Sequence, residues 1–273
     1  MIKDIIVNLS RGQDFAAAYA VSIAAAFKAH LVGISFVYDP VIPDGTFGGI
    51  PVDVIEMQRR ENSREARAVV ERFEASAKAA GTAVESQLVD ASMSGGATRF
   101  GEMVRRFDLA VVGQAQREHG ASEDLMIEAA LFESGRPVVV VPYIQKQGLK
   151  LDRVMVGWDG SRTAARAIAD AMPFLERAKA VDIVIVAEER KQQEIAGASM
   201  LAHLSRHGVP ATARPTTRGA ISIENVILSY ASDNGADFLV MGGYGHSRLR
   251  EFILGGVTRG ILASMTVPVL MSH

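Results

Sequence analysis

One stretch near the C-terminus combines residue types and a spacing that suit the binding of a phosphate group. After the apolar run at residues 238–241 it contains five glycines: Gly242, Gly243, Gly245, Gly255 and Gly256. A glycine has no Cβ, so its backbone N–H can approach a ligand closely. Residues 257–264 can begin a helix, and the first N–H groups of a helix attract anions. The stretch indicates phosphate or nucleotide binding, although it matches neither the Walker loop nor the Gly-x-Gly-x-x-Gly motif.

The segments around these glycines predict a parallel sheet. Residues 238–241, Phe-Leu-Val-Met, are typical of a buried strand, so the first glycines stand at its carboxyl end. Open α/β sheets bind ligands at this edge. A strand, an alanine-rich helix and a second strand within residues 4–37 predict a βαβ unit with a right-handed crossover. Residues 136–142 predict a further strand, and their two prolines favour an edge position.

The composition restricts the class of protein. With 273 residues, of which 48% are hydrophobic, the chain is long enough for two domains that each bury a core. A net charge of −2 and only 6% aromatic residues give no electrostatic surface for nucleic acid. The sequence has no cysteine, which excludes disulfides and thiol chemistry and fits a reducing cytoplasm. Residues 1–7 do not resemble a leader, and the longest apolar stretch, 15–27, is too short to span a membrane. We therefore expect a cytoplasmic protein with no nucleic-acid or membrane partner.

The chain repeats itself. Residues 108–113, Asp-Leu-Ala-Val-Val-Gly, correspond to residues 237–242, Asp-Phe-Leu-Val-Met-Gly, and the same order of strands and helices resumes after a polar linker at 143–150. A repeat of this length indicates a duplicated domain. We predict an N-terminal domain at 1–144 and a C-terminal domain at 151–273.

The spacing of the glycines resembles a known family. Gly242, Gly245 and Gly255 follow the pattern Gly-x-x-Gly, nine residues, Gly, which is similar to the nucleotide-binding signature of the universal stress protein family. Residues 241–259 resemble the tandem members of that family. The resemblance implies an α/β fold of two Rossmann-like domains, each a five-stranded parallel sheet of order 3-2-1-4-5 with helices on both faces. The two domains would pack as an intramolecular pseudo-dimer through their last strands, and ATP with Mg²⁺ would be the ligand.

The resemblance also implies which residues of the C-terminal repeat form the nucleotide site. They are Gly157, Trp158, Asp159, Val186, Met241, Gly242, Tyr244, Gly245, Gly255, Gly256, Val257 and Thr258. An aspartate at the place of Asp159 lies near the adenine in the family, and Val186 and Met241 match positions that line the adenine pocket. The family usually has Ser or Thr where this chain has Gly256, so one hydroxyl is missing at the phosphates. Thr258 can supply another.

Several of these residues also have structural interpretations. Asp159 or Ser161 can cap the following helix, and the glycines can serve as ordinary turn residues. Met241 and Val186 are equally suited to a buried core.

Two further groups of polar residues are interpreted as solvated helix faces. His203 and His207 are four residues apart, a spacing that suits a shared metal, but no third ligand follows at a recognisable distance. The charged residues of the long helix that ends near Ala80, among them Arg59 and Arg60, lie opposite its apolar face. We expect no metal site and no catalytic residue.

The first repeat lacks the features of the second. The aligned residues Asn8, Leu9 and Ser10 include no aspartate, and residues 114–124 lack the second glycine of the signature. The leading hypothesis is a tandem universal stress protein that binds one ATP per chain, in its C-terminal domain, as a regulatory ligand. The alternatives are a nucleotide-free interaction protein of the same fold and, third, a weak ATPase. In addition to binding ATP, the protein can form a homodimer or bind an unknown protein partner.

Overall fold

The structure is a computed structural model that describes residues 1–40, 51–92, 95–116, 120–187, 190–244 and 256–273. The strands are β1 (Asp4–Leu9), β2 (His30–Tyr38), β3 (Glu85–Ala91), β4 (Leu109–Gly113), β5 (Val138–Val141), β6 (Arg153–Gly157), β7 (Ala180–Ala187), β8 (Ala211–Thr217), β9 (Phe238–Gly242) and β10 (Val269–Ser272). The helices are α1 (Asp14–Phe27), α2 (Val52–Ala79), α3 (Gly95–Val104), α4 (Gly120–Glu133), α5 (Arg162–Leu175), α6 (Arg190–Arg206), α7 (Ile223–Asp233) and α8 (Gly256–Ser264).

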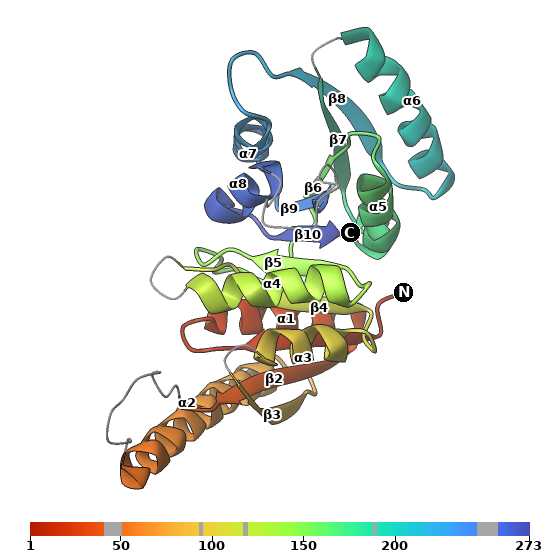
Figure 1. Ribbon diagram of the computed structural model, residues 1–273. Coiled ribbons are helices and arrows are strands. Elements are labelled where there is room, and N and C mark those ends of the chain that lie inside the picture. The colour runs from red at the N-terminus through yellow and green to blue at the C-terminus, as the bar shows by residue number, and fades with distance from the viewer. Residues whose placement is uncertain (41–50, 93–94, 117–119, 188–189, 245–255) are drawn as a thin grey trace.

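The described strands form one ten-stranded sheet in the order β3-β2-β1-β4-β5-β10-β9-β6-β7-β8 (Figure 1). Strands β1–β5 form its N-terminal half and strands β6–β10 its C-terminal half. Within each half the strands are parallel and follow the order 3-2-1-4-5. This confirms the α/β fold and the strand order that the family resemblance implies.

The two halves meet where β5 and β10 pair in antiparallel orientation. Val269 lies opposite Val140, and Met271 lies opposite Val138. The last strands of the two halves therefore lie side by side, as predicted (Figure 1). The expectation of an edge strand at 136–142 is wrong for the molecule, because β5 pairs with β4 on one side and with β10 on the other. Pro137 and Pro142 lie just outside the strand, so neither removes a hydrogen bond of the ladder.

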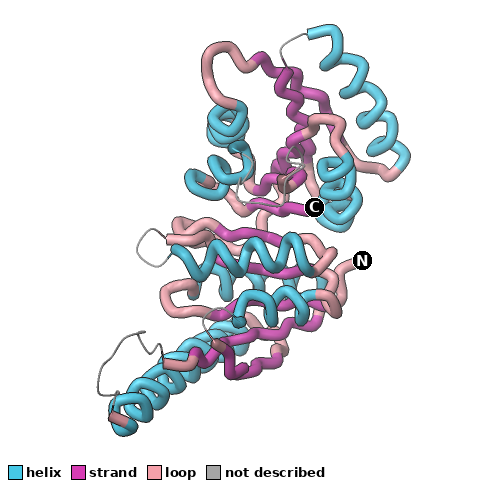
Figure 2. The backbone as a smooth tube through the Cα atoms, viewed as in Figure 1, coloured by secondary structure: helices cyan, strands magenta, loops and turns pink. Residues whose placement is uncertain are grey.

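Helices cover both faces of the sheet (Figure 2). Alternate residues of each strand point to opposite faces, so Ile5 and Val7 join one core cluster and Ile6 joins the other. The first cluster packs beneath α1, α2, α5 and α6 and includes the aromatic rings of Phe27 and Phe174, whose centroids are 4.9 Å apart. The second cluster packs beneath α3, α4, α7 and α8. The long apolar runs of the strands are explained by burial on both sides.

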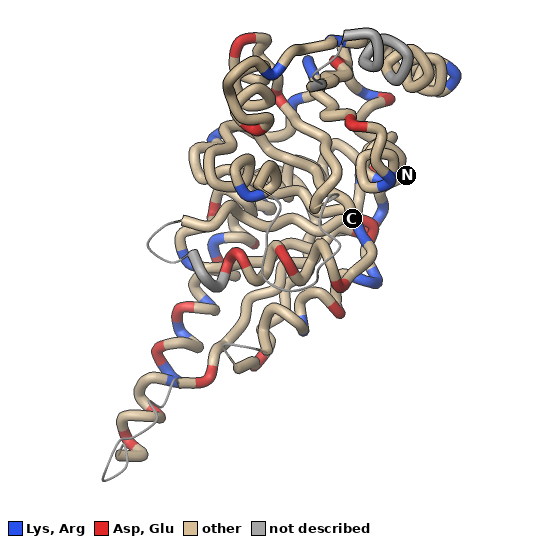
Figure 3. Tube along the Cα trace, turned by 45° about the horizontal axis from the view of Figure 1, so that its top comes forward, with Lys and Arg blue, Asp and Glu red and all other residues tan. Residues whose placement is uncertain are grey.

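Helix α2 is amphipathic, as its pattern predicts. Ala66, Val69, Phe73 and Ala77 are buried against the sheet. Basic and acidic residues are interspersed along the rest of the helix (Figure 3). Its N-terminal part extends away from the sheet (Figure 1). Arg59 and Arg60 are exposed, in agreement with a solvated face.

Candidate functional site

The predicted site lies where the strand order of the C-terminal half reverses direction. Strand β6 has β7 on one side and β9 on the other, and Val156 of β6 pairs with Val240 of β9. Gly157 ends β6 and Gly242 ends β9, so both strand ends open at the same edge of the sheet. Crevices at such a reversal are the usual ligand sites of open α/β sheets.

Gly242 approaches the beginning of α5 more closely than any other residue type allows. A Cβ at this position would lie 2.6 Å from the Ala164 backbone nitrogen and 2.6 Å from Thr163 Oγ1. A glycine is therefore required for packing between the end of β9 and the first turn of α5. This packing alone explains Gly242, whether or not a ligand binds nearby.

The turn between β6 and α5 holds Asp159 at the surface. The Asp159 carboxylate oxygen Oδ1 accepts a hydrogen bond of 2.9 Å from the Ser161 backbone N–H, and Gly160 between them has a φ of 76°. Ser161 Oγ accepts a hydrogen bond of 3.1 Å from the Ala164 N–H and caps α5. The capping interpretation is thus correct for Ser161, whereas Asp159 orders the turn and keeps an exposed carboxylate beside the end of β9.

Trp158, Val186 and Met241 lie on different faces of the sheet. The Trp158 backbone N–H donates to the Val184 carbonyl at 3.0 Å, and its ring packs partly buried against the cluster beneath α5. Its indole Nε1 is buried and has no hydrogen-bond partner among the described residues. Met241 is buried in the opposite cluster, and Val186 packs against that cluster while remaining half-buried. Both residues therefore contribute to the core.

A hydrogen bond joins the turn after β9 to α8. Tyr244 adopts a left-handed conformation with a φ of 54°, and its backbone N–H donates to Thr258 Oγ1 at 3.2 Å. Thr258 is buried, and Val257 beside it is partly buried. The hydroxyl that the resemblance assigns to the phosphates is therefore already an acceptor within the protein.

Gly256 is the first residue of α8 and is exposed. A Cβ at this position would have no atom of a described residue within 4 Å. The site therefore has room for the Ser or Thr that the family usually carries there. Gly245 and Gly255, the remaining glycines of the signature, lie outside the described residues.

The turn after β9 also contacts the N-terminal half. The ring centroid of Phe132, on α4, lies 4.8 Å from that of Tyr244 and 4.9 Å from that of His273. A Cβ on Gly243 would lie 2.8 Å from Leu131 Cδ2. Burial raises the pKa of the Tyr244 hydroxyl, and the α4 carboxylates of Glu128 and Asp124 raise it further. The phenol therefore stays neutral at physiological pH.

Sequence reasoning missed this contact with α4. Leu131 and Phe132 have no feature that distinguishes them from ordinary apolar residues of an amphipathic helix. The available signal was the predicted packing of the two halves through their last strands, which brings α4 close to the end of β9.

Glutamine side chains fill the equivalent strand ends of the N-terminal half. Gln13, at the start of α1, packs against Gly113 at the end of β4, and a Cβ there would clash with the Gln13 amide. Gln114 Oε1 accepts from the Tyr143 N–H at 3.2 Å, and its Nε2 donates to the Leu262 carbonyl of α8 at 2.7 Å. Both glutamines are buried. The N-terminal edge is thus occupied by two glutamine side chains, of which Gln114 also ties the two halves together.

The two histidines considered as metal ligands lie together but without a third ligand. The ring centroids of His203 and His207 are 4.9 Å apart, and both residues are exposed. Within the described ranges, no group of three or more histidine, cysteine or acidic residues has a geometry that could hold a metal ion. No helix of the described chain is both long and apolar enough to cross a bilayer.

The fold is that of a doubly wound α/β protein. It has the strand order, the helices on both faces and the strand ends at the reversal that define this class. Residues 150–273, the C-terminal half of the chain, match the model of the universal stress protein family. A universal stress protein of Synechocystis sp. is 25% identical over 197 residues, which are 60% of this chain and 57% of that protein. A universal stress protein of Methanocaldococcus jannaschii is 38% identical over 45 residues, 16% of this chain and 28% of that protein. The chain therefore spans less than two thirds of the length of either relative.

Solved structures of the family share the fold over nearly the whole chain. A universal stress protein from Archaeoglobus fulgidus DSM 4304 superposes with a TM-score of 0.75 and 17% identity, over 98% of this chain and 97% of its own. A universal stress protein from Pseudomonas aeruginosa UCBPP-PA14 superposes with a TM-score of 0.61 and 12% identity, over 99% of this chain and 93% of its own. At these identities the similarity establishes the fold alone.

Proposed function

We propose that the C-terminal half binds one ATP, with Mg²⁺, as a regulatory ligand of a stress-response protein. One arrangement at the sheet edge formed by β6 and β9 supports the proposal. An exposed aspartate and a strand that ends in glycine lie beside the N-termini of two helices. Asp159 follows β6, Gly242 ends β9, and α5 and α8 begin nearby with Ser161 as cap and Gly256 as first residue.

Each part of this edge has a chemical use. The Asp159 carboxylate can accept hydrogen bonds from the adenine or ribose, and the first N–H groups of α8 can donate to phosphate oxygens. The Mg²⁺ would neutralise part of the phosphate charge, and it needs only phosphate oxygens and water for its coordination. Apart from the Asp159 carboxylate, the described residues of this edge offer no evident general base for hydrolysis, so a regulatory role is favoured over turnover.

Variants of two neighbouring residues test the proposal. Asp159→Ala removes the exposed carboxylate, and Ser161→Ala changes the same turn by removing the cap of α5 instead. We expect Asp159→Ala to weaken Mg-ATP binding about tenfold or more, whereas Ser161→Ala lowers stability by about 1 kcal/mol and leaves affinity within a few-fold of the wild type. Isothermal titration calorimetry and urea denaturation measure the two quantities. Equal affinities for the wild type and Asp159→Ala would remove Asp159 from the site.

A second candidate function is a nucleotide-free interaction protein. Two observations favour it: Gly256 lacks the hydroxyl that the family usually places at the phosphates, and Thr258, whose hydroxyl could replace it, is buried. In that case the edge of the sheet would serve only for packing. Calorimetry of the wild-type protein with Mg-ATP distinguishes the two functions, because the second predicts no heat of binding.

A further inference from the structure

The N-terminal half has a hollow of about 530 Å³ far along the sheet from the glycine signature. It lies between α2 and the carboxyl ends of β2 and β3, at the opposite end of the N-terminal half from β5 and β10 (Figure 1). Its lining residues are Val37, Glu56, Arg59, Arg60, Ser63, Arg64, Arg67 and Asp90. Four of these eight residues are arginines from three turns of one helix.

The four arginines differ in whether a carboxylate neutralises them. Arg60 Nη2 lies 3.0 Å from Glu56 Oε2, and Arg64 Nη2 lies 2.7 Å from Glu61 Oε1. In the part of the chain that the structure describes, neither Arg59 nor Arg67 has an ion-pair partner within 4.0 Å. Two guanidinium groups that form no ion pair with a described residue therefore border the hollow.

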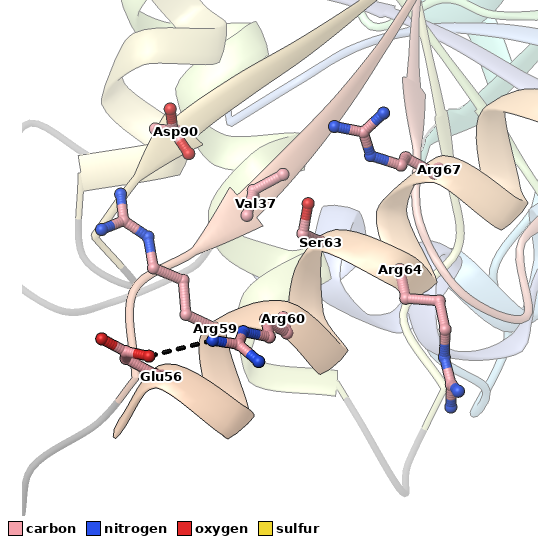
Figure 4. A pocket seen from close by; sticks show the side chains of 8 residues that line it. All are labelled: Val37, Glu56, Arg59, Arg60, Ser63, Arg64, Arg67 and Asp90. Carbon is pink, nitrogen blue, oxygen red and sulfur yellow. Dashed lines mark hydrogen bonds and ion pairs between the residues drawn. The ribbon is translucent and has the colours of Figure 1, made fainter. Parts of the chain in front are cut away.

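The spacing along α2 directs these two arginines to the same side of the helix. Arg59, Ser63 and Arg67 are each four residues apart, so they share a face and span about 12 Å along the axis. Figure 4 shows Arg59 and Arg67 on either side of Ser63 and Val37, whereas Arg60 turns to Glu56 and Arg64 points away. Val37 is buried and forms an apolar floor between the two cations.

Paired guanidinium groups of this kind suit phosphate oxygens. An arginine presents two parallel N–H donors that match a phosphate, and a hydroxyl between two arginines adds a further donor. Asp90, at the end of β3, borders the same hollow and can accept a hydrogen bond from a hydroxyl group but would repel a second anion. This combination favours a ligand that carries both phosphate and hydroxyl groups.

We propose that this hollow is a second ligand site, which binds a phosphorylated small molecule through Arg59 and Arg67. The Ser63 hydroxyl donates to the phosphate, and Asp90 accepts from a hydroxyl group of the ligand. The site uses neither the glycine signature nor any residue of the C-terminal half, so it is independent of the proposed ATP site.

The same helix provides a control with matched charge. The double variant Arg59→Gln, Arg67→Gln removes the two unpaired cations, and Arg60→Gln, Arg64→Gln removes the two paired ones with the same change in net charge. Inorganic pyrophosphate is the probe, titrated calorimetrically into the full chain at an ionic strength of about 0.15 M, where long-range attraction is screened. Far-UV circular dichroism verifies that α2 remains folded in both variants.

We expect pyrophosphate to bind the wild type and the Arg60, Arg64 variant alike, and the Arg59, Arg67 variant to lose that site with a decrease in affinity of about tenfold or more. If pyrophosphate also enters the C-terminal half, the Arg59, Arg67 variant keeps that one site and its Mg-ATP binding is unchanged. The proposal is overturned if the wild type binds no pyrophosphate at millimolar concentration. It is also overturned if the Arg59, Arg67 variant binds as the wild type does, or if both variants lose affinity equally.

Discussion

The chemistry of the candidate site depends on two residues at the beginning of α8. Gly256 is exposed, and no described residue lies close to the place of its missing Cβ, while Thr258 is buried and holds the turn after β9 through the Tyr244 N–H. The two positions therefore differ in what a hydroxyl can do. At residue 258 it stabilises the turn, and at residue 256 it would be available to a ligand.

Gly256→Ser tests this difference. The serine Cβ fits without displacing any described residue, its hydroxyl can donate to a phosphate oxygen, and serine is a better residue than glycine at a helix N-terminus. We predict that Mg-ATP binds this variant about three- to tenfold more tightly than the wild type, as measured by calorimetry. Gly256→Ala fills the same space without a hydroxyl and should leave the affinity nearly unchanged. An equal gain for both variants would show that helix stability, not the hydroxyl, is responsible.

A buried carboxylate fixes the strands of the C-terminal half. Asp182, in β7, is only 2% exposed, and Arg153 of β6 and Arg214 of β8 donate to it at 2.8 and 3.1 Å. Burial by itself would raise the pKa of Asp182, but the hydrogen bonds and charges of the two arginines outweigh burial and lower it. The pair of ion contacts therefore links three adjacent strands.

Asp182→Asn should lower the free energy of unfolding by about 2 kcal/mol at neutral pH, less than for a fully buried pair because both arginines reach solvent. A lowered folded-state pKa means that the wild-type carboxylate adds stability above its unfolded pKa, and that this contribution is lost as pH falls through the folded pKa. The difference between wild type and variant should therefore shrink below about pH 4. Urea denaturation at several pH values measures it. Asp152→Asn, which breaks the exposed pair with Lys179, should have little effect, and a pH-independent difference for Asp182→Asn would contradict the argument.

At the level of elements, α4 of the N-terminal half and α8 of the C-terminal half meet at the turn after β9. Phe132 packs on Tyr244 and His273, Leu131 fits against Gly243, and Tyr244 binds Thr258. Residues 243 and 244 of the turn after β9 are thus contacted by α4 on one side and by α8 on the other. Because the contact crosses between the halves, the N-terminal half can influence a ligand in the other half without binding one itself.

Phe132→Ala tests this influence. Removal of the ring frees Tyr244 on one side, so the turn has more conformations to lose when a ligand orders it. We predict that the variant binds Mg-ATP about two- to tenfold more weakly by calorimetry. Leu125→Ala on the same helix is the control, because Leu125 is exposed and its removal should not change affinity. If the two variants bind ATP equally, α4 does not stabilise the turn.

The sequence predicted the elements well because most of its signals are local. Apolar runs such as 109–113 and 238–242 are long enough to mark strands buried on both faces, and Gly81 ends α2 in the expected left-handed conformation. The contacts of Phe132 with Tyr244 and of Gln114 with α8 could not be predicted, since they join residues far apart in the chain. The edge position of residues 136–142 was wrong for the same reason. The prolines indicate only where the strand ends, and the partner strand β10 lies more than a hundred residues further along the chain.

The candidate site was predicted in part. The apolar run before Gly242 correctly predicted the end of β9. For the turn after β6 the capping interpretation is confirmed for Ser161, whereas the ligand role of Asp159 stays a prediction. The role of Thr258 within the protein could not be foreseen, because a hydroxyl two residues into a helix can point to a ligand or to a neighbouring backbone. Ligand binding at these residues stays a prediction.

On the scale of the whole molecule, one sheet runs through both halves. The antiparallel pairing of β5 with β10 places fully buried valines, such as Val140 and Val269, at the junction. Phe27 of α1 and Phe174 of α5 pack across the same junction, and Arg177 lies 4.0 Å from the centroid of the Phe27 ring. Neither half can unfold without exposing the apolar surface of the other.

We therefore predict that the chain unfolds in one cooperative transition. Trp158, the single tryptophan, reports on the C-terminal half alone, whereas far-UV circular dichroism reports on all helices and strands. In a urea titration the two signals should give the same midpoint and slope. A tryptophan transition at a different midpoint from that of the dichroism would show that the halves unfold separately.

Binding of one ATP per chain is tested most directly by titrating the purified chain with Mg-ATP. Trp158 fluorescence follows the binding, and calorimetry determines the stoichiometry. Trp158 precedes Asp159 at the end of β6, so a nucleotide bound at this edge changes the surroundings of its ring. We expect a saturable change with one ATP per chain, and in Asp159→Ala the same change at about tenfold or higher ATP concentration. An absence of heat and of any spectral change at millimolar ATP, or two ATP per chain, would contradict it.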